Sequence, residues 1–279
     1  MEPPVDTERD RPAFDKHAAD EFRARYAPDP TLPLAVMVCR LVPELKRESL
    51  LNACGAIEEL ALSGAPTQLV LVGDGSIKDE LAARAEQTNM RAGRKLVVLT
   101  GELSDPRPAY DAADVVLGMG SSALRALAFA KPLVVVGERG FSELLTPQTA
   151  PIFLANGWYG LGPGSLGEGV TGMRRSLSTI LGNATLRAEL GKFGRDLVLD
   201  RFSLFAAAKK QEEEYEHAIA NRVSRSQLAA AATKSLAGII DYKVRRKISR
   251  WRGTIAVDDA NAVAAFPAQP SPEPGQLRI

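Results

Sequence analysis

Leu34-Ala-Val-Met-Val-Cys39 is a compact run of apolar residues, and the rest of the chain is interpreted outward from it. A run of this length without polar alternation is typical of a strand that is covered on both faces. Four similar runs follow, at residues 68–73, 95–100, 114–117 and 133–137. Segments with helical spacing separate them, at residues 48–62, 77–88, 106–113 and 121–130. This alternation predicts repeated βαβ units.

Such units indicate an α/β fold with a doubly wound parallel sheet, because right-handed crossovers place helices on both faces of the sheet. A glycine-rich loop follows at residues 157–164, and C-terminal helices are then expected at residues 169–181, 184–201 and 205–223. We therefore expect one Rossmann-like domain over residues 34–223, closed by these helices. Its ligand should bind beyond the carboxyl ends of the strands.

The composition is ordinary for a globular protein, with 45% hydrophobic and 25% charged residues among 279. The only cysteines are Cys39 and Cys54, which excludes a disulfide-based scaffold. No apolar run approaches the roughly 20 residues that a bilayer-spanning helix needs. The start of the chain is polar and acidic, unlike a secretory signal. We therefore expect a cytoplasmic protein.

The net charge of +1 conceals an uneven distribution. Between residues 222 and 252, nine basic residues stand against the single acid Asp241, so this segment carries +8 and the rest of the chain −7. Residues 224–256 are interpreted as a basic amphipathic helical arm, which can indicate an anionic partner. Peripheral contact with anionic lipid at the inner membrane face is one interpretation. A solvated helix, or one docked on another domain, is the other. Nucleic acid is a poorer match, since no recognition motif accompanies the charge.

Both ends of the chain differ from its centre. Residues 1–33 are rich in Pro, Asp and Arg, and we interpret them as a linker-like segment with a short helix near residues 15–26. Residues 257–279 contain four prolines and little to bury, which predicts a disordered tail.

Two cations follow the first predicted strand. Arg40 and Lys46 stand six residues apart in a loop at the expected ligand edge. Arginine supplies a planar fork and lysine a point charge, so the pair could hold a diphosphate. The residues alone are equally consistent with solvated loop cations.

A glycine-rich turn follows the fourth predicted strand. Gly118 and Gly120 precede Ser121 and Ser122, which open a helix. The free N–H groups and the dipole at a helix start favour an anion. Either serine could contact a phosphate or cap the helix, and a plain tight turn with a serine cap explains the residues equally well.

The loops after the second and third predicted strands carry weaker signals. Gly73 and Gly75 permit close approach or a positive φ, although a plain turn is the simpler interpretation. Glu102 or Leu103, in the loop after residue 100, could lie against a nucleobase or ribose.

The loop after the fifth predicted strand offers two carboxylates, Glu138 and Glu143, which could bind sugar hydroxyls or be solvated. His17 and His217 fall in predicted helices and lack metal-ligand spacing with the cysteines, so neither a metal nor a resident cofactor is expected. No P-loop or serine-hydrolase elbow is present.

Taken in order, these signals resemble the C-terminal, donor-binding domain of GT-B glycosyltransferases, most closely glycosyltransferase family 4. The similar segments are residues 4–12, Arg40-Leu-Val-Pro-Glu-Leu-Lys46, Leu69-Val-Leu-Val-Gly-Asp-Gly75, residues 110–116, residues 126–134 and the closing helices up to Arg201-Phe-Ser203. Together they cover residues 3–220.

The resemblance implies a nucleotide-sugar donor bound between two Rossmann-like domains and transferred by a retaining hexosyltransferase. It implies that Arg40 and Lys46 bind the diphosphate and stabilise the leaving nucleoside diphosphate. Residues 100–103 would hold the nucleobase. Glu143 matches an acidic residue that the family carries after the fifth strand.

The sequence departs from the family pattern in two respects. The family often carries Glu-x7-Glu before an Ala-Met-Ala-like helix; here Leu117 and Arg125 stand at those positions. Arg125 could bind phosphate instead or be a surface charge. In addition, the family's acceptor-binding domain would precede Pro4, so an acceptor domain on a separate chain is expected as a partner. A noncatalytic nucleotide-binding or interaction module is therefore the alternative function. A dehydrogenase is disfavoured, since no Gly-x-Gly-x-x-Gly follows the first strand.

Overall fold

The computed structural model describes residues 3–221 and 225–251. This part of the chain divides after Ala207 into two compact units. The expected tail at residues 257–279 and the end of the expected basic arm, residues 252–256, lie outside the described residues.

The first unit is built on a sheet of six strands in the order β3-β2-β1-β4-β5-β6. The first five strands are parallel, and β6 pairs antiparallel with β5. Their bounds are β1 Leu34–Val38, β2 Gln68–Val72, β3 Val97–Gly101, β4 Val115–Gly118, β5 Leu133–Val136 and β6 Ser142–Leu144. The doubly wound α/β fold predicted from the apolar runs is confirmed.

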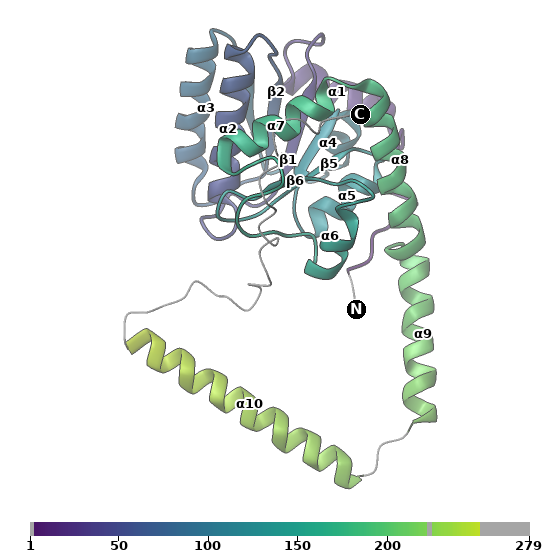
Figure 1. Ribbon diagram of the computed structural model, residues 1–279. Helices are drawn as coiled ribbons and strands as arrows, with labels where there is room; N and C mark the ends of the chain where they lie inside the picture. Colours follow the sequence, from purple (N-terminus) through teal and green to yellow (C-terminus); the bar gives the residue numbers. More distant parts are fainter. Residues whose placement is uncertain (1–2, 222–224, 252–279) are drawn as a thin grey trace, which may run out of the picture. The chain divides into compact units, whose positions relative to one another are not determined.

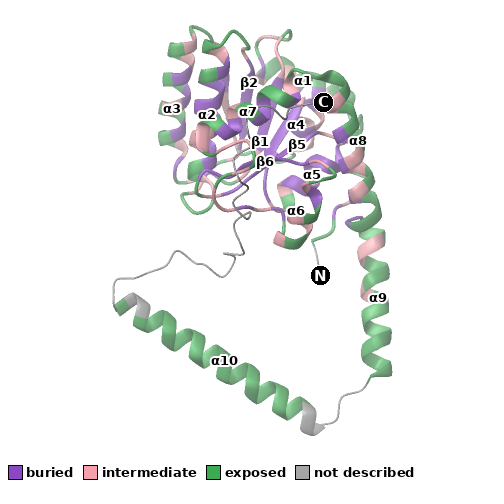
Figure 2. Cartoon of the chain, viewed as in Figure 1, coloured by how far each residue is buried: buried purple, intermediate pink, exposed green. Residues whose placement is uncertain are grey.

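Helices cover both faces of this sheet (Figure 1). They are α1 Lys16–Tyr26, α2 Arg47–Leu62, α3 Lys78–Ala92, α4 Arg107–Ala112, α5 Ser121–Ala128, α6 Ala150–Asn156, α7 Gly169–Leu181 and α8 Ala184–Arg201. Successive residues of β1 alternate between two cores: Val36 packs with apolar residues of α1, α4, α5 and α6, while Met37 packs with those of α2, α3 and α7. Figure 2 shows the resulting buried layer along the strands.

Strand β6 is the main departure from the expected loop at residues 138–143. Arg139 and Gly140 adopt positive φ, and Phe141 N donates to Glu138 O, which makes a tight turn. The turn sends the chain back along β5, so that Glu143 pairs with Val135. The carboxylate of Glu143 therefore belongs to a strand, because two residues of turn suffice to reverse the chain here.

The N-terminal segment is part of the first unit. Val5 forms a β-bridge to Ser203, and α1 packs on α4. The guanidinium of Arg195 donates to three carbonyl oxygens, those of Thr7, Asp10 and Ala128, at 2.7–3.0 Å. The N-terminal segment, which the sequence suggested to be linker-like, thus packs on the domain through these contacts.

Helix α8 approaches α5 through glycine. A Cβ atom on Gly191 would lie 2.1 Å from the carbonyl oxygen of Ala130, and one on Gly194 would lie 2.6 Å from Leu127 Cδ2. Such distances are far below van der Waals contact, so the closeness of the two helices depends on these residues having no side chain.

The second unit contains most of α9, Leu204–Ala220, and all of α10, Arg225–Trp251. Every described side chain of α10 is exposed. In the described part of the chain, no helix is both long and apolar enough to cross a membrane.

Candidate functional site

The strand order has a topological switch point between β1 and β4, in the middle of the sheet. The chain runs from β1 outward through β2 to β3 and then returns to place β4 on the other side of β1. Loops that leave β1 and β4 therefore separate in opposite directions at their carboxyl ends, which is where open α/β sheets bind ligands. The two flanking loops are residues 39–46 and residues 119–120, just before α5.

The loop after β1 is held by the loop after β2. Leu41 N donates to Asp74 O at 2.9 Å, and Ile77 N donates to Leu41 O. A Cβ atom on Gly73 would lie 1.9 Å from the carbonyl oxygen of Cys39, and one on Gly75 would lie 2.2 Å from that of Leu41. These glycines thus let two backbones touch, and they position the loop that carries Arg40.

Arg40 and Lys46 are the two cations of this loop, and they lie close enough for their charges to interact. Arg40 is exposed, whereas Lys46 is half-buried. Burial lowers the pKa of Lys46, and the charge of Arg40 lowers it further. Within residues 3–221 and 225–251, neither side chain has a hydrogen bond or ion pair. By contrast, neighbouring Arg47 is neutralised by Glu80.

This arrangement carries an electrostatic cost that the fold does not offset. An unpaired, partly desolvated ammonium beside a like charge is unfavourable in the free protein. Leu45, directly before Lys46, also adopts a left-handed φ of 63°, which is uncommon for a residue other than glycine. A dianion between the two cations would relieve their repulsion.

The turn after β4 places a helix start beside the same switch point. Gly120 adopts φ 56°, and no side chain caps α5. Gly120 N donates to Trp158 O, which fixes the turn. The hydroxyl of Ser122 bonds to the backbone of Met119, while Ser121 is exposed. A Cβ atom on Gly118 would lie 3.1 Å from Ser122 Oγ, so the absence of a side chain at Gly118 leaves room for the turn to close.

Strand β3 ends at Gly101, which has φ 76°. Glu102 is exposed, and Leu103 is partly buried against the core. Both residues follow the carboxyl end of a strand, as expected, but β2 and its loop separate this strand from β1.

Glu143 is committed to the fold of the neighbouring loop. Its side chain is buried and accepts hydrogen bonds from the backbone N and the Oγ of Ser165. Gly164, beside it, approaches Ser142 O so closely that a Cβ would lie 2.1 Å away. Glu143 therefore secures residues 164–167 to β6.

Glu138, unlike Glu143, lies near the carboxyl end of β5. It stands two residues after the end of β5, is half-buried and accepts a hydrogen bond from the hydroxyl of Tyr159. Burial, together with this hydrogen bond, raises the pKa of Tyr159, which keeps the phenol protonated. Glu48 of α2 accepts from the amides of Arg139 and Gly140 at 2.7 Å each, which ties the turn to the helix that follows Lys46. The sequence flagged Glu138 but gave no sign of Tyr159 or Glu48 as its companions.

Arg125 has an internal partner. Its guanidinium pairs with the carboxylate of Asp10 at 2.9 Å. Burial raises the pKa of Asp10, and Arg125 opposes that effect. Leu117, at the other position of the family's glutamate pair, is fully buried in β4. The structure thus uses Arg125 to hold the N-terminal segment.

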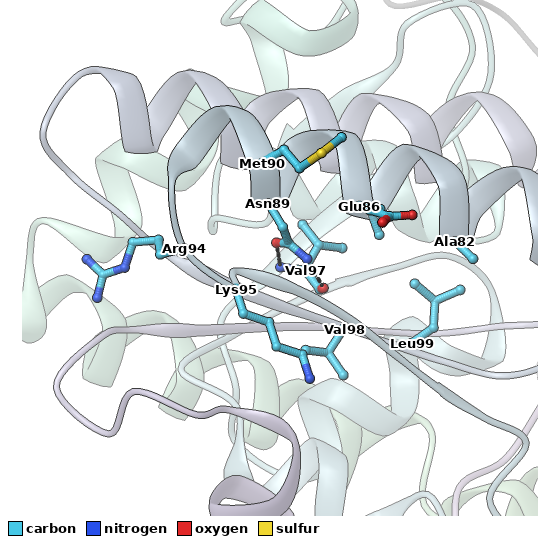
Figure 3. A pocket seen from close by; sticks show the side chains of 10 residues that line it. Ala82, Glu86, Asn89, Met90, Arg94, Lys95, Val97, Val98 and Leu99 are labelled. Atoms are coloured by element: carbon cyan, nitrogen blue, oxygen red, sulfur yellow. Dashed lines mark hydrogen bonds between the residues drawn. The ribbon is translucent and has the colours of Figure 1, made fainter.

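A cavity lies elsewhere, along the outer side of edge strand β3 (Figure 3). Its volume is about 530 Å³, and the second half of α3 and the first half of β3 line it. Asn89 spans its floor through hydrogen bonds to Val97 and Leu96. Strands β2 and β3 separate it from the switch point. In the described residues, no three His, Cys, Asp or Glu side chains are grouped to hold a metal ion.

The comparisons with known proteins concern the family and the fold of the chain. Residues 33–158 match a family model described as "Glycosyl transferases group 1". No curated protein matches the chain significantly.

Solved structures with the same fold include a glycosyltransferase from Rickettsia africae, with a TM-score of 0.60 at 15% identity, covering 79% of this chain and 57% of that one. The Anabaena protein HepE, in complex with UDP and glucose, gives a TM-score of 0.54 at 16% identity over 76% of this chain and 55% of that one. The C-terminal domain of LpcC, a group 1 glycosyl transferase from Francisella tularensis, gives a TM-score of 0.52 at 18% identity over 72% of this chain and 99% of that one.

The chain therefore spans little more than half the length of the two larger structures, but nearly all of a C-terminal domain. At these identities the likeness concerns the fold. Residues 33–158 thus resemble the group 1 glycosyl transferases, and the first unit has the Rossmann-like architecture of one half of a GT-B fold.

Proposed function

We propose that the first unit binds a nucleotide diphosphate-sugar in the crevice between the loop after β1 and the start of α5. The observation that carries this proposal is the pair Arg40 and Lys46, which lacks protein partners in the described residues. The uncapped helix start at Ser121 supports it. Two cations and free helix amides facing one crevice suit a diphosphate better than a monoanion.

The same groups fit the chemistry of glycosyl transfer. When the bond between sugar and diphosphate breaks, negative charge grows on the leaving phosphate. Arg40 and Lys46 would stabilise that charge, and so lower the barrier. Glu138 and its partner Tyr159 lie at the end of β5, where they would accept and donate hydrogen bonds to sugar hydroxyls. This would supply the contacts that Leu117 and Arg125 do not offer.

We further propose a retaining outcome, with the acceptor presented by another domain on this or another polypeptide. The relatives that share the fold are about twice as long as the matched region. Proton NMR of the sugar released by slow donor hydrolysis tests the stereochemistry. Initial appearance of the inverted anomer would contradict retention.

Calorimetry on the full chain with UDP-, GDP- and ADP-sugars tests donor binding. We expect one of them to bind with a dissociation constant in the micromolar range, and the corresponding nucleoside monophosphate to bind much more weakly, because it lacks the second phosphate. A folded protein that binds none of them would refute the proposal.

A noncatalytic nucleotide-binding module is a second candidate, favoured by the ion pair of Arg125 with Asp10. A module that does not read the sugar would bind a nucleoside diphosphate as tightly as the nucleotide-sugar. Tighter binding of the nucleotide-sugar, lost in Glu138→Gln, would favour the enzyme.

As the pH rises, donor affinity should begin to decline at a lower pH than it would if Lys46 had the ordinary pKa of a lysine. Lys46 must be protonated to attract phosphate, and burial lowers its pKa in the free protein below the ordinary 10.5. As the pH rises through that pKa, the cation is lost and affinity falls. Titration calorimetry between about pH 7 and 10 should show this loss in the native protein and not in Lys46→Arg, whose guanidinium stays charged. Identical profiles would contradict a role for Lys46.

A further inference from the structure

The last three turns of α10 carry one continuous apolar stripe. Ile240, Val244, Ile248 and Trp251 are spaced by four, four and three residues, which places them on one face of a helix. All four are exposed, Trp251 by 88% of its surface. Exposed aliphatic and indole surface in a row is not expected of a helix that faces water alone.

Basic residues flank this stripe. Residues 240–251 contain five Lys or Arg against the single acid Asp241, a net charge of +4. At 100° per residue, Lys243 and Lys247 lie on the flank next to the stripe, while Arg245 lies on the other flank and pairs with Asp241. Apolar residues bordered by long cationic side chains are typical of helices that lie in a membrane interface, where lysines extend toward lipid phosphates.

Two other occupants suit the segment less well. In a coiled coil of two copies, the heptad that begins at Leu236 and Ile239 would continue with Lys243 and Arg246, so cations would face each other in its core. A nucleic acid would use the cations but leave Trp251 and the aliphatic stripe in water. An anionic bilayer accommodates both the charge and the stripe.

We propose that residues 240–251 bind the surface of an anionic bilayer, with Ile240, Val244, Ile248 and Trp251 at the boundary of the acyl chains and the cations among the headgroups. The inference is independent of the proposed donor site, which lies in the other unit. Its chemistry requires negatively charged lipid, because the apolar stripe spans only three turns and gives modest affinity without charge attraction.

Co-sedimentation of the full chain with phosphatidylcholine vesicles tests this, with and without 30% phosphatidylglycerol. We expect the chain to bind anionic vesicles at least tenfold more tightly than neutral ones. Binding to the anionic vesicles should decline in about 0.5 M salt. Lys243→Glu with Lys247→Glu should reduce binding to anionic vesicles more than tenfold. The matched control is Lys209→Glu with Lys210→Glu on α9, which makes the same charge change on exposed residues and should bind as the native chain does.

Tryptophan fluorescence gives a second readout. Trp158 is buried, whereas Trp251 is exposed, so a blue shift on adding anionic vesicles should disappear in Trp251→Phe. Absence of vesicle binding would overturn the proposal, as would equal losses in the two lysine pairs. Binding of RNA without vesicles, or a Trp251-dependent dimer without vesicles, would assign the surface to those partners instead.

Discussion

Replacing both Arg40 and Lys46 by alanine is expected to lower affinity for the nucleotide-sugar at least a hundredfold. A hydrogen bond to a charged group contributes about 1.5–3 kcal/mol, and each 1.4 kcal/mol is a tenfold change in affinity. Calorimetry with the donor identified in the binding screen measures the loss. Lys95→Ala is a control, because Lys95 is exposed, as Arg40 is, but stands two residues before β3, at the opposite end of that strand from the candidate site.

The same double variant should not lose stability. Neither side chain bonds to another described residue, and removing two like charges relieves repulsion between them. We therefore expect the midpoint of thermal unfolding to stay the same or to rise slightly. Native affinity in the variant would contradict the site, and a large fall in the midpoint would show that the two cations serve the fold.

The largest effect on stability is expected from Gly191→Val. The new Cβ would have to occupy a position 2.1 Å from Ala130 O, a backbone atom that cannot rotate away. Separating α8 from α5 would disturb a tightly packed core, at an expected loss of about 3 kcal/mol in the free energy of unfolding. Gly194→Ala should cost less, because its clash is with the end of the Leu127 side chain.

Urea unfolding followed by circular dichroism measures these differences. Ala188→Val is the control, since Ala188 is an exposed residue on the same helix and only helix propensity changes, by about 0.5 kcal/mol. Equal losses in Gly191→Val and Ala188→Val would show that the two helices do not depend on a side-chain-free contact.

The regular part of the fold was predictable because its signals are local. Five apolar runs gave the parallel strands, and the expected helices at residues 169–181 and 184–201 coincide with α7 and α8. Strand β6 was not predictable in this way. Its three residues include a glutamate, and its burial depends on Ser165, more than twenty residues further along the chain.

In the candidate site, too, the features with local sequence signals were predictable and those that depend on distant residues were not. That Arg40, Lys46 and Ser121 stand beyond the carboxyl ends of strands follows from the alternation of strands and helices, which the sequence indicates. The partner of Arg125 does not, because Asp10 lies 115 residues away in a segment without a regular pattern. Whether the cation at residue 125 faces a ligand or an internal acid is decided by tertiary packing alone.

The ion pair of Arg125 and Asp10 also limits how this domain can change over time. Replacing Arg125 by the glutamate that the family often carries at this position would set two carboxylates about one hydrogen bond apart, with Asp10 buried. The substitution of Arg125 by glutamate is therefore unfavourable while Asp10 is present. The same substitution is not unfavourable once the charge at residue 10 has been removed. The two positions are therefore epistatic: the charge at residue 10 decides whether an acid at residue 125 is tolerated.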